Sequence, residues 1–197
     1  MTKPISTGKE RRIYRTAWRA WDVVPMENAL RLHSLTATWL PNAKQVAKCW
    51  KKRKHSSPAW SCTCGIYGAF RKEMLIRNSL VIGRCAFWGK TIVHQYGLRS
   101  QYAYPLSLAL GNYRARRCLI CRKDLGRDHY YMWSKYDNDK EWMPCCNNCQ
   151  KALSQLGYLY TVSAQSLLRE LLNTYGCDLE VTYDKNRQKD KEGNLQP

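Results

Sequence analysis

The sequence is poor in acidic residues, and most of its middle has almost none. It carries 15 Asp and Glu against 33 Lys and Arg, which gives a net charge of +18. Residues 28–123 contain 18 Lys or Arg and a single acid, Glu73. A surface of one sign repels itself and usually faces a polyanion, of which nucleic acid is the commonest. The charge distribution therefore predicts a nucleic-acid partner, either DNA or RNA.

The sequence also lacks long apolar runs. None approaches the roughly 18 residues that a membrane-spanning helix needs. The N-terminal segment MTKPISTGKERRIYR has no apolar stretch that could act as a signal peptide. We therefore expect no membrane partner and a cytoplasmic location. Hydrophobic residues make up 44% of the chain, enough for a packed core, so disorder is excluded for most of it.

Ten cysteines without an export signal are expected to be thiols that bind metal, catalyse or lie buried. Two CxxC pairs, Cys118–Cys121 and Cys146–Cys149, are 24 residues apart. Such pairs aim four thiolates at one tetrahedral zinc ion. Cys145 could replace Cys146 in a CxxxC pair, but the CxxC geometry is commoner, so we assign Cys145 to the core.

The sequence around these pairs predicts the order of a treble-clef zinc finger. Residues 129–136 are rich in aromatics and suit a strand, residues 137–139 favour a turn, and a short helix is expected to begin at the second CxxC. A second helix should start at the cap Ser163 and end at Gly176, with a strand over residues 179–183 after it.

A second ligand set lies upstream, with the spacing C-x5-H-x6-C-x-C. Its members are Cys49, His55, Cys62 and Cys64, which supply four soft or borderline ligands for a second zinc. The alternative is a buried CxC pair beside a surface histidine. The isolated Cys85 and Cys177 stand in apolar patterns and are predicted to be core residues.

The intervening segments are typical of short strands, with one helix predicted over Asn42–Trp50. One strand is expected over Ser79–Trp88 and ends in a Gly-Lys turn, and another is expected over Thr91–Tyr96. The fold class is therefore α+β: a small, mainly-β, barrel-like basic domain, then a treble-clef domain with a C-terminal helix and strand. The predicted divisions are a basic arm (1–27), the β domain (28–112), the zinc domain (113–183) and a disordered tail (184–197).

Residues 14–110 resemble a family of small uncharacterised proteins from actinobacteria and their phages. The resemblance rests on the segments WRAWDV, SCTCGIYG, VIGRCAFWGK and YGLRSQYAYPLSL. The chain departs from the family pattern at Gly68 and at Leu98-Arg99-Ser100. The resemblance implies no activity, but the family pattern includes the upstream ligand positions. It also implies that a phage could encode the chain, which would then act in the host cytoplasm.

Residues 118–157 are similar to the zinc segment of the recombination endonuclease VII branch of the HNH nucleases. The similar pieces are CLIC, the Asp128-His129 pair and CNNCQKALSQLG. The resemblance implies a hydrolytic role in which Asp128 binds a catalytic Mg²⁺ or Mn²⁺ ion and His129 is the general base. Tyr131 replaces the family's second His and Gln150 its Asn, so we expect a non-catalytic zinc finger.

The sequence as a whole predicts a zinc-stabilised nucleic-acid-binding protein with one or two zinc ions. The alternatives are an HNH-like nuclease and an adaptor that binds a host nucleoprotein complex. Trp50, Trp60, Tyr102 and Tyr104 could stack on bases, or they could pack in the core. The residues expected to contact phosphates are Lys48, Lys51, Lys52, Arg53, Lys54, Arg114, Arg116 and Arg117.

Overall fold

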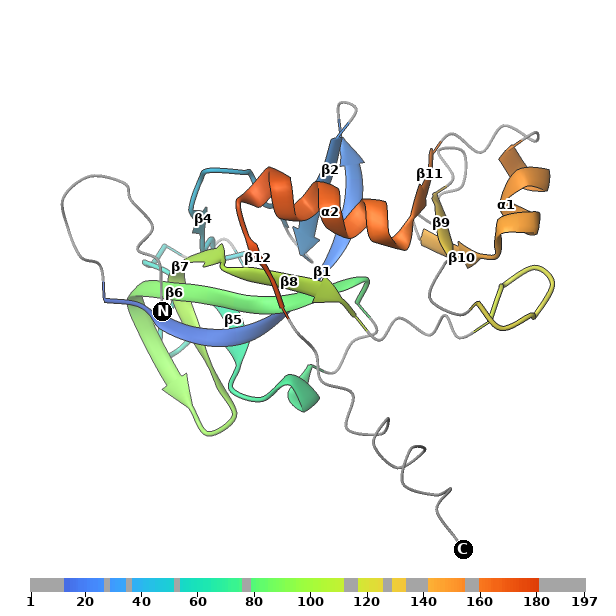
Figure 1. Ribbon diagram of the computed structural model, residues 1–197. Coiled ribbons are helices and arrows are strands. Elements are labelled where there is room, and N and C mark those ends of the chain that lie inside the picture. Colours follow the sequence, from blue (N-terminus) through green and yellow to red (C-terminus); the bar gives the residue numbers. More distant parts are fainter. Residues whose placement is uncertain are drawn as a thin grey trace, which may run out of the picture.

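Strands dominate the fold, as the sequence predicts (Figure 1). The structure is a computed structural model that describes residues 13–26, 29–34, 37–51, 54–75, 79–111, 117–125, 129–133, 142–154 and 160–180. The strands of the large sheet are β1 (Arg15–Met26), β2 (Ala29–Ser34), β3 (Ala37–Thr38), β4 (Gln45–Val46), β5 (Ile66–Ala69), β6 (Val81–His94), β7 (Gly97–Pro105), β8 (Ser107–Leu110) and β12 (Asp178–Leu179). A smaller sheet contains β9 (Tyr130–Trp133), β10 (Trp142–Cys145) and β11 (Tyr160–Ser163). The helices are the 3-10 turn η1 (Lys72–Met74), α1 (Asn147–Ser154) and α2 (Ala164–Tyr175).

Four antiparallel pairings close a ring at the centre of the large sheet. Strand β1 pairs with β6, β6 with β7, β7 with β5, and β5 returns to β1 through the pair Trp18 and Ala69. This closure agrees with the expected barrel-like arrangement. Because each of these strands is paired along both edges for part of its length, the ring is a rigid platform for the loops that leave it.

Strand β6 continues through the position where the sequence predicts a turn. The expected Gly-Lys turn after Trp88 is a β-bulge, and the register with β7 shifts between Trp88 and Thr91. Gly89 has φ 74°, and a Cβ there would lie 2.6 Å from the ring of Tyr102. Glycine at a bulge lets a strand bend without ending it, so the two predicted strands are one.

The predicted helix over Asn42–Trp50 is wrong. In the structure this segment contains only β4, which pairs with Tyr102 and Ala103 of β7. The backbone N–H of Ala47 also donates to the carbonyl of Gln101 at 2.8 Å. Pairing with an edge of the sheet satisfies the backbone groups here and overrides the local helix preference.

The predicted basic arm is also incorrect, because its described part is a strand of the sheet. Strand β1 pairs with β6 from Arg15 opposite Phe87 to Trp21 opposite Val81. Ala17, Trp21 and Val23 are buried on one face of the strand, at positions that fit the period-2 pattern of a half-buried strand. Residues 1–12 lie outside the described residues.

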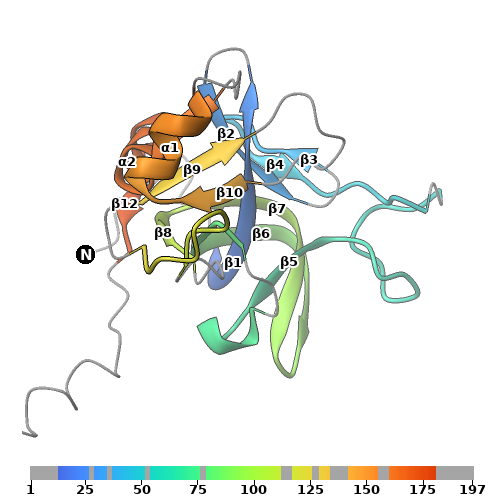
Figure 2. The same cartoon turned by 90° about the vertical axis from the view of Figure 1, so that its right-hand side faces the viewer.

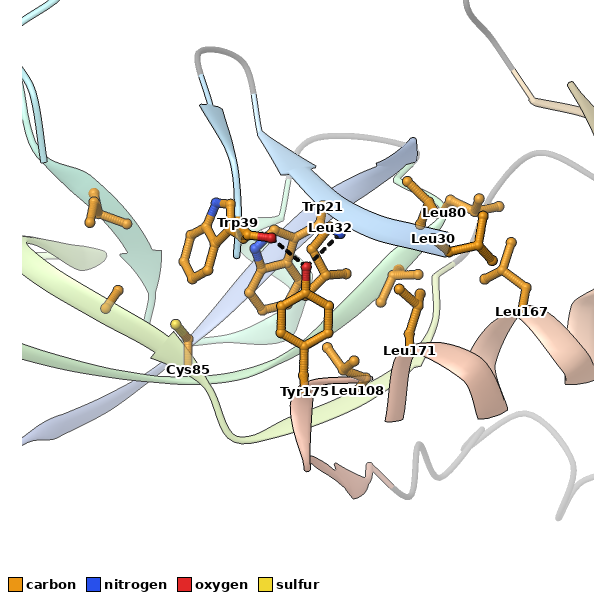
Figure 3. Close-up of a cluster of buried hydrophobic side chains, with 14 of the residues drawn as sticks. Trp21, Leu30, Leu32, Trp39, Leu80, Cys85, Leu108, Leu167, Leu171 and Tyr175 are labelled. Carbon is orange, nitrogen blue, oxygen red and sulfur yellow. Dashed lines mark hydrogen bonds between the residues drawn. The ribbon is translucent and has the colours of Figure 1, made fainter. Parts of the chain in front are cut away.

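Helix α2 has the predicted ends but packs mainly on the large sheet. The side chain of Ser163 accepts from the N–H of Ser166, and Gly176 closes the helix with φ 59°. Its buried face, which includes Leu167, Leu171 and Tyr175, packs against β8 and β2 (Figure 3). The predicted zinc domain over residues 113–183 therefore divides between two parts of the fold.

The end of α2 leads back into the large sheet. Strand β12 pairs in parallel with β8, with Asp178 opposite Ser107. Val181, Tyr183 and the predicted disordered tail lie outside the described residues. No helix in the described part of the chain is long and apolar enough to cross a membrane.

The smaller sheet and α1 form a module at one end of the molecule (Figure 1). A small core of Cys118, Leu125, Met132 and Cys145 holds it together. The indole N–H of Trp142 donates to the carbonyl of Val23 at 2.6 Å, which fixes the module to β1.

Tyr175 joins α2 to two strands through its buried hydroxyl. The hydroxyl donates to the carbonyl of Trp39 at 2.6 Å and accepts from the N–H of Leu32 at 3.0 Å (Figure 3). Replacement Tyr175→Phe keeps the ring but leaves both backbone groups unpaired. We expect the free energy of unfolding in urea to fall by about 1–3 kcal/mol. The control Tyr96→Phe, at a ring that is 60% exposed, should change it by less than about 0.5 kcal/mol; equal effects would contradict this role.

Candidate metal centres

The structure brings together both ligand sets that the spacing predicts. Within each set, one ligand atom per residue lies within 4.8 Å of the other three. The all-cysteine cluster consists of Cys118, Cys121, Cys146 and Cys149, and the cysteine–histidine cluster consists of Cys49, His55, Cys62 and Cys64. Both clusters could hold a metal ion such as zinc. The alternative of a buried CxC pair beside an unrelated histidine does not fit this grouping.

The sulfur spacing in the all-cysteine cluster fits tetrahedral coordination. The sulfur atoms of Cys121 and Cys146 are 3.7 Å apart. Zinc–sulfur bonds of about 2.3 Å at the tetrahedral angle place neighbouring sulfurs about 3.8 Å apart. A disulfide needs about 2.05 Å. The two CxxC pairs are therefore at the distance that a shared metal ion requires.

Local turns aim each CxxC pair at the cluster. The N–H of Cys118 donates to the carbonyl of Lys123 at 2.8 Å, and the N–H of Arg122 returns to the carbonyl of Cys118 at 3.0 Å. Arg122 has φ 62°, which tightens this knuckle. The second pair straddles the start of α1, where the N–H of Gln150 donates to the carbonyl of Cys146 at 2.9 Å.

Backbone donors in this cluster favour thiolates. Burial raises the pKa of Cys118, but N–H groups of Cys121, Cys146 and Ile120 outweigh burial and lower the pKa to about 6. The N–H of Cys149 lowers the pKa of Cys146. Burial and the neighbouring thiols raise the pKa of Cys149 to about 12. Such a mixed set of thiols becomes four thiolates only when a cation balances their charge.

The choice between Cys145 and Cys146 is settled in favour of Cys146. Cys145 is fully buried in the module's core, and burial raises the pKa of its thiol to about 12. Its Cα pairs across the hairpin with Tyr130. Cys145 is thus a small core residue, as predicted, and Cys146 is the ligand candidate.

The cysteine–histidine cluster has the same spacing. The sulfur atoms of Cys49 and Cys62 are 3.8 Å apart, and the sulfur of Cys64 lies 3.8 Å from Nε2 of His55. The N–H of Cys64 donates to the sulfur of Cys62 and, with the side chains of His55, Cys64 and Cys49, outweighs burial and lowers the pKa of the Cys62 thiol to about 6. The four ligands come from a segment between β4 and β5 that extends away from the two helices (Figure 2).

One tautomer of His55 suits ligation through Nε2. Nδ1 of His55 lies 3.1 Å from the carbonyl oxygen of Ser56 and can donate to it when Nδ1 carries the proton. In that tautomer the Nε2 lone pair is left for a metal ion. Metal-binding histidines commonly fix their ring by donating the second N–H to a backbone carbonyl.

Arg99 fixes the Cys-x-Cys turn to the sheet. Its Nη1 donates to the carbonyls of Cys62 and Cys64, the latter at 3.0 Å, while Nε donates to Nε2 of His94 at 3.0 Å. Gly65 allows the close approach, because it has φ 129° and a Cβ there would lie 2.9 Å from Arg99. Arg99 therefore acts as a positioning residue beneath the cysteine–histidine cluster.

Arg99 is only 5% exposed, and among the described residues no carboxylate lies within salt-bridge distance of it. Buried charges usually need a counter-charge. Three thiolates and a neutral imidazole around Zn²⁺ carry one net negative charge, which would balance the guanidinium. The sequence interpretation missed Arg99 and His94. The sequence feature that could have identified Arg99 is a charged residue, between Leu98 and Ser100, inside an otherwise apolar strand.

The structure describes only some of the residues on which the resemblance to HNH nucleases depends. Asp128 lies outside the described residues. His129 precedes β9, its carbonyl accepts from the N–H of Ala164 at 2.9 Å, and its ring packs edge-on against Tyr131 with centroids 4.9 Å apart. The catalytic assignment of Asp128 and His129 stays a prediction.

The predicted phosphate contacts fall into two groups. Lys48, Lys51 and Lys54 are exposed beside the cysteine–histidine cluster, and Arg117 is exposed beside the all-cysteine cluster, 4.0 Å from Asp124. The remaining four, Lys52, Arg53, Arg114 and Arg116, lie outside the described residues.

The four aromatic candidates for base stacking differ in exposure. Trp50 and Trp60 are 64% and 75% exposed. Tyr102 is half-buried beneath Lys44, whose Nζ lies 4.3 Å from the ring centroid. Tyr104 donates its hydroxyl to the carbonyl of Tyr175 at 3.0 Å and is a structural residue. Of these four, the two tryptophans are the ones left open for a ligand.

Comparisons of the chain with models of known protein families, with curated proteins and with solved structures find no match. The assignment of function therefore depends on the two clusters and their surroundings.

Neighbouring cysteines offer a matched test of the all-cysteine cluster. Cys146→Ala should remove one zinc equivalent from the purified protein, because three thiolates hold the ion far less tightly than four. Cys145→Ala should leave zinc content unchanged and only lower the free energy of unfolding by about 1 kcal/mol. Elemental analysis measures the zinc. If Cys145→Ala lost zinc and Cys146→Ala kept it, the ligand would be Cys145 and not Cys146.

The Arg99→Gln variant tests the positioning role. Zinc release to a chromogenic chelator should become about 10- to 100-fold faster for one of two equivalents, the range found when outer-shell partners of metal ligands are removed. The other equivalent, in the all-cysteine cluster, should release at the parent rate. Arg71→Gln, at an exposed arginine, is the control. Unchanged release of both equivalents from Arg99→Gln would show that Arg99 does not support the cluster.

Proposed function

We propose that this protein is a zinc-stabilised nucleic-acid-binding protein. Two zinc ions would occupy the all-cysteine and cysteine–histidine clusters, the first in a treble-clef finger built from the knuckle, the β9–β10 hairpin and α1. Each cluster offers four protein ligands, which is the closed arrangement of structural zinc. The metal would thus hold the fold, and binding would fall to the surface around it.

The observation that carries this proposal is the positive surface beside the cysteine–histidine cluster. Lys48, Lys51 and Lys54 are exposed on the segment that supplies its ligands. In the described part of residues 28–123, Glu73 is the one acid available to offset them. Exposed lysines at this density attract phosphates, and the release of counterions then drives binding.

The test is binding of labelled oligonucleotides, followed by fluorescence anisotropy across a salt series. The parent affinity should fall by orders of magnitude between about 50 and 200 mM salt. Replacing Lys48, Lys51 and Lys54 together by Gln should weaken binding and flatten the plot of log affinity against log salt. The slope should change by about one unit for each phosphate that the variant no longer neutralises.

A control variant carries the same charge change elsewhere. Lys123→Gln, Lys151→Gln and Arg169→Gln lie at exposed positions of the all-cysteine module and α2. This variant should keep nearly the parent affinity and slope. Equal weakening by both variants would show that only net charge matters, and would remove the surface beside the cysteine–histidine cluster from the proposal.

The nuclease alternative makes a different forecast in the same assays. The parent protein would cleave plasmid or single-stranded DNA with Mg²⁺ or Mn²⁺, and His129→Ala would abolish cleavage without loss of zinc. The adaptor alternative predicts no oligonucleotide binding at low salt. We expect binding without cleavage, because Tyr131 and Gln150 stand at two positions that the nuclease chemistry uses.

A further inference from the structure

A groove of about 980 Å³ lies beside the cysteine–histidine cluster. Residues of β1, β2 and β5 and of the segment at η1 line it, and so does the segment that carries the ligands, at Lys48, Trp50 and residues 63–65. The β6–β7 turn, at His94, Tyr96 and Gly97, borders it as well. The volume is near the upper end of the roughly 300–1,000 Å³ usual for ligand sites.

Aromatic rings from three separate segments border this groove and remain open to solvent. Trp50 is 64% exposed, Tyr67 is 49% exposed and Tyr96 is 60% exposed. The hydroxyl of Tyr67 donates to the carbonyl of Thr63, which fixes that ring against the ligand segment. Large apolar groups that gather at one groove without cover mark a binding site.

The charges around the groove favour an anion. Arg19 and Lys48 border it, and Asp22 is the one acid among its lining residues. Arg99 borders it too, but the charge of the zinc-bound cluster would balance its guanidinium. Arg19 donates to the carbonyl of Tyr67, lies over the ring of Trp39 and has no carboxylate within salt-bridge distance among the described residues. The groove lining therefore carries a net positive charge.

We propose that this groove binds a single-stranded segment of nucleic acid, with unpaired bases stacked on Trp50, Tyr67 and Tyr96 and with Lys48 at the phosphates. The proposal rests on the proposed function and specifies its ligand. A duplex offers no free base faces, whereas every unpaired base has one. Aromatic rings joined to a cationic groove are the usual means of binding single strands without reading their sequence.

The cysteine–histidine cluster supports this groove directly. Residues 63–65 line it, and Arg99 holds the carbonyls of Cys62 and Cys64 on the sheet. Loss of metal from this cluster would release the wall that carries Trp50, so base stacking should depend on this ion more than on the ion of the all-cysteine cluster.

The experiment compares single-stranded and duplex oligonucleotides of about 16 nucleotides, the upper end of site sizes for single-strand-binding folds. Trp50→Ala combined with Tyr96→Ala should lower single-strand affinity by about 10-fold or more and leave duplex affinity within about 2-fold. Phe70→Ala is the matched control, because Phe70 is an aromatic residue that is 40% exposed and is not among the residues that line the groove. Zinc content and thermal unfolding verify that each variant is folded.

A second measurement needs no substitution. A single strand containing 5-iodouracil crosslinks on irradiation to aromatic rings stacked on it, and mass spectrometry locates the joined residue. Crosslinks at Trp50, Tyr67 or Tyr96 support the groove. Crosslinks confined to other residues overturn it.

The possible failures can be told apart. If the parent protein binds no nucleic acid at low salt, both the proposed function and the groove proposal fail. If it binds, but the double variant keeps its single-strand affinity or loses duplex affinity equally, the groove proposal alone fails. Displacement of the single strand by an acidic peptide at a lower concentration than by an unlabelled oligonucleotide would identify a protein ligand and would also overturn it.

Discussion

The grouping of four cysteine or histidine ligands at one point is the constraint on which the irregular parts of this fold depend. The described residues between β4 and β5 form neither helix nor strand, and few of them are buried. A segment of this length without its own hydrophobic core needs a cross-link, such as a disulfide or a bound metal ion, to hold one conformation. The cysteine–histidine cluster draws it together, and the all-cysteine cluster does the same for the knuckle and α1. In both places sulfur-to-sulfur distances of 3.7 and 3.8 Å match a shared ion and exclude a disulfide.

The barrel-like sheet holds the cysteine–histidine cluster in place and so fixes the groove beside it. Arg99 on β7 holds the Cys-x-Cys turn through two carbonyls, and it is in turn oriented by His94 on β6. The same turn forms a wall of the groove that Trp50 and Tyr96 border. The cysteine–histidine cluster, the sheet and the groove are thus connected through Arg99 and the Cys-x-Cys turn.

The sequence predicted the clusters better than the fold around them. Ligand spacing is a local property, so CxxC pairs and the C-x5-H-x6-C-x-C series identified all eight candidate ligands. The cap Ser163 and the stop Gly176 are local too, and α2 has those ends. The packing of α2 on β8 and β2 is not local, because it depends on the buried hydroxyl of Tyr175 and on partners in β2 and at Trp39, far away in the sequence.

The failures have the same physical origin. The segment Asn42–Trp50 is not a helix because an edge of β7 satisfies its backbone, and residues 15–26 are not an arm because β6 pairs with them. Basic side chains in β1 concealed its alternating apolar pattern. Arg99 was missed because two of its three acceptors are backbone carbonyls, which carry no sequence signal.

The most direct test of this account is a crystal structure of the native protein with anomalous data collected on both sides of the zinc absorption edge. The account predicts two zinc peaks, one about 2.3 Å from each of four sulfurs in the all-cysteine cluster and one bonded to three sulfurs and Nε2 of His55. A single peak would show that only one of the two clusters binds zinc. No peak, or sulfurs joined at about 2.05 Å, would contradict the account.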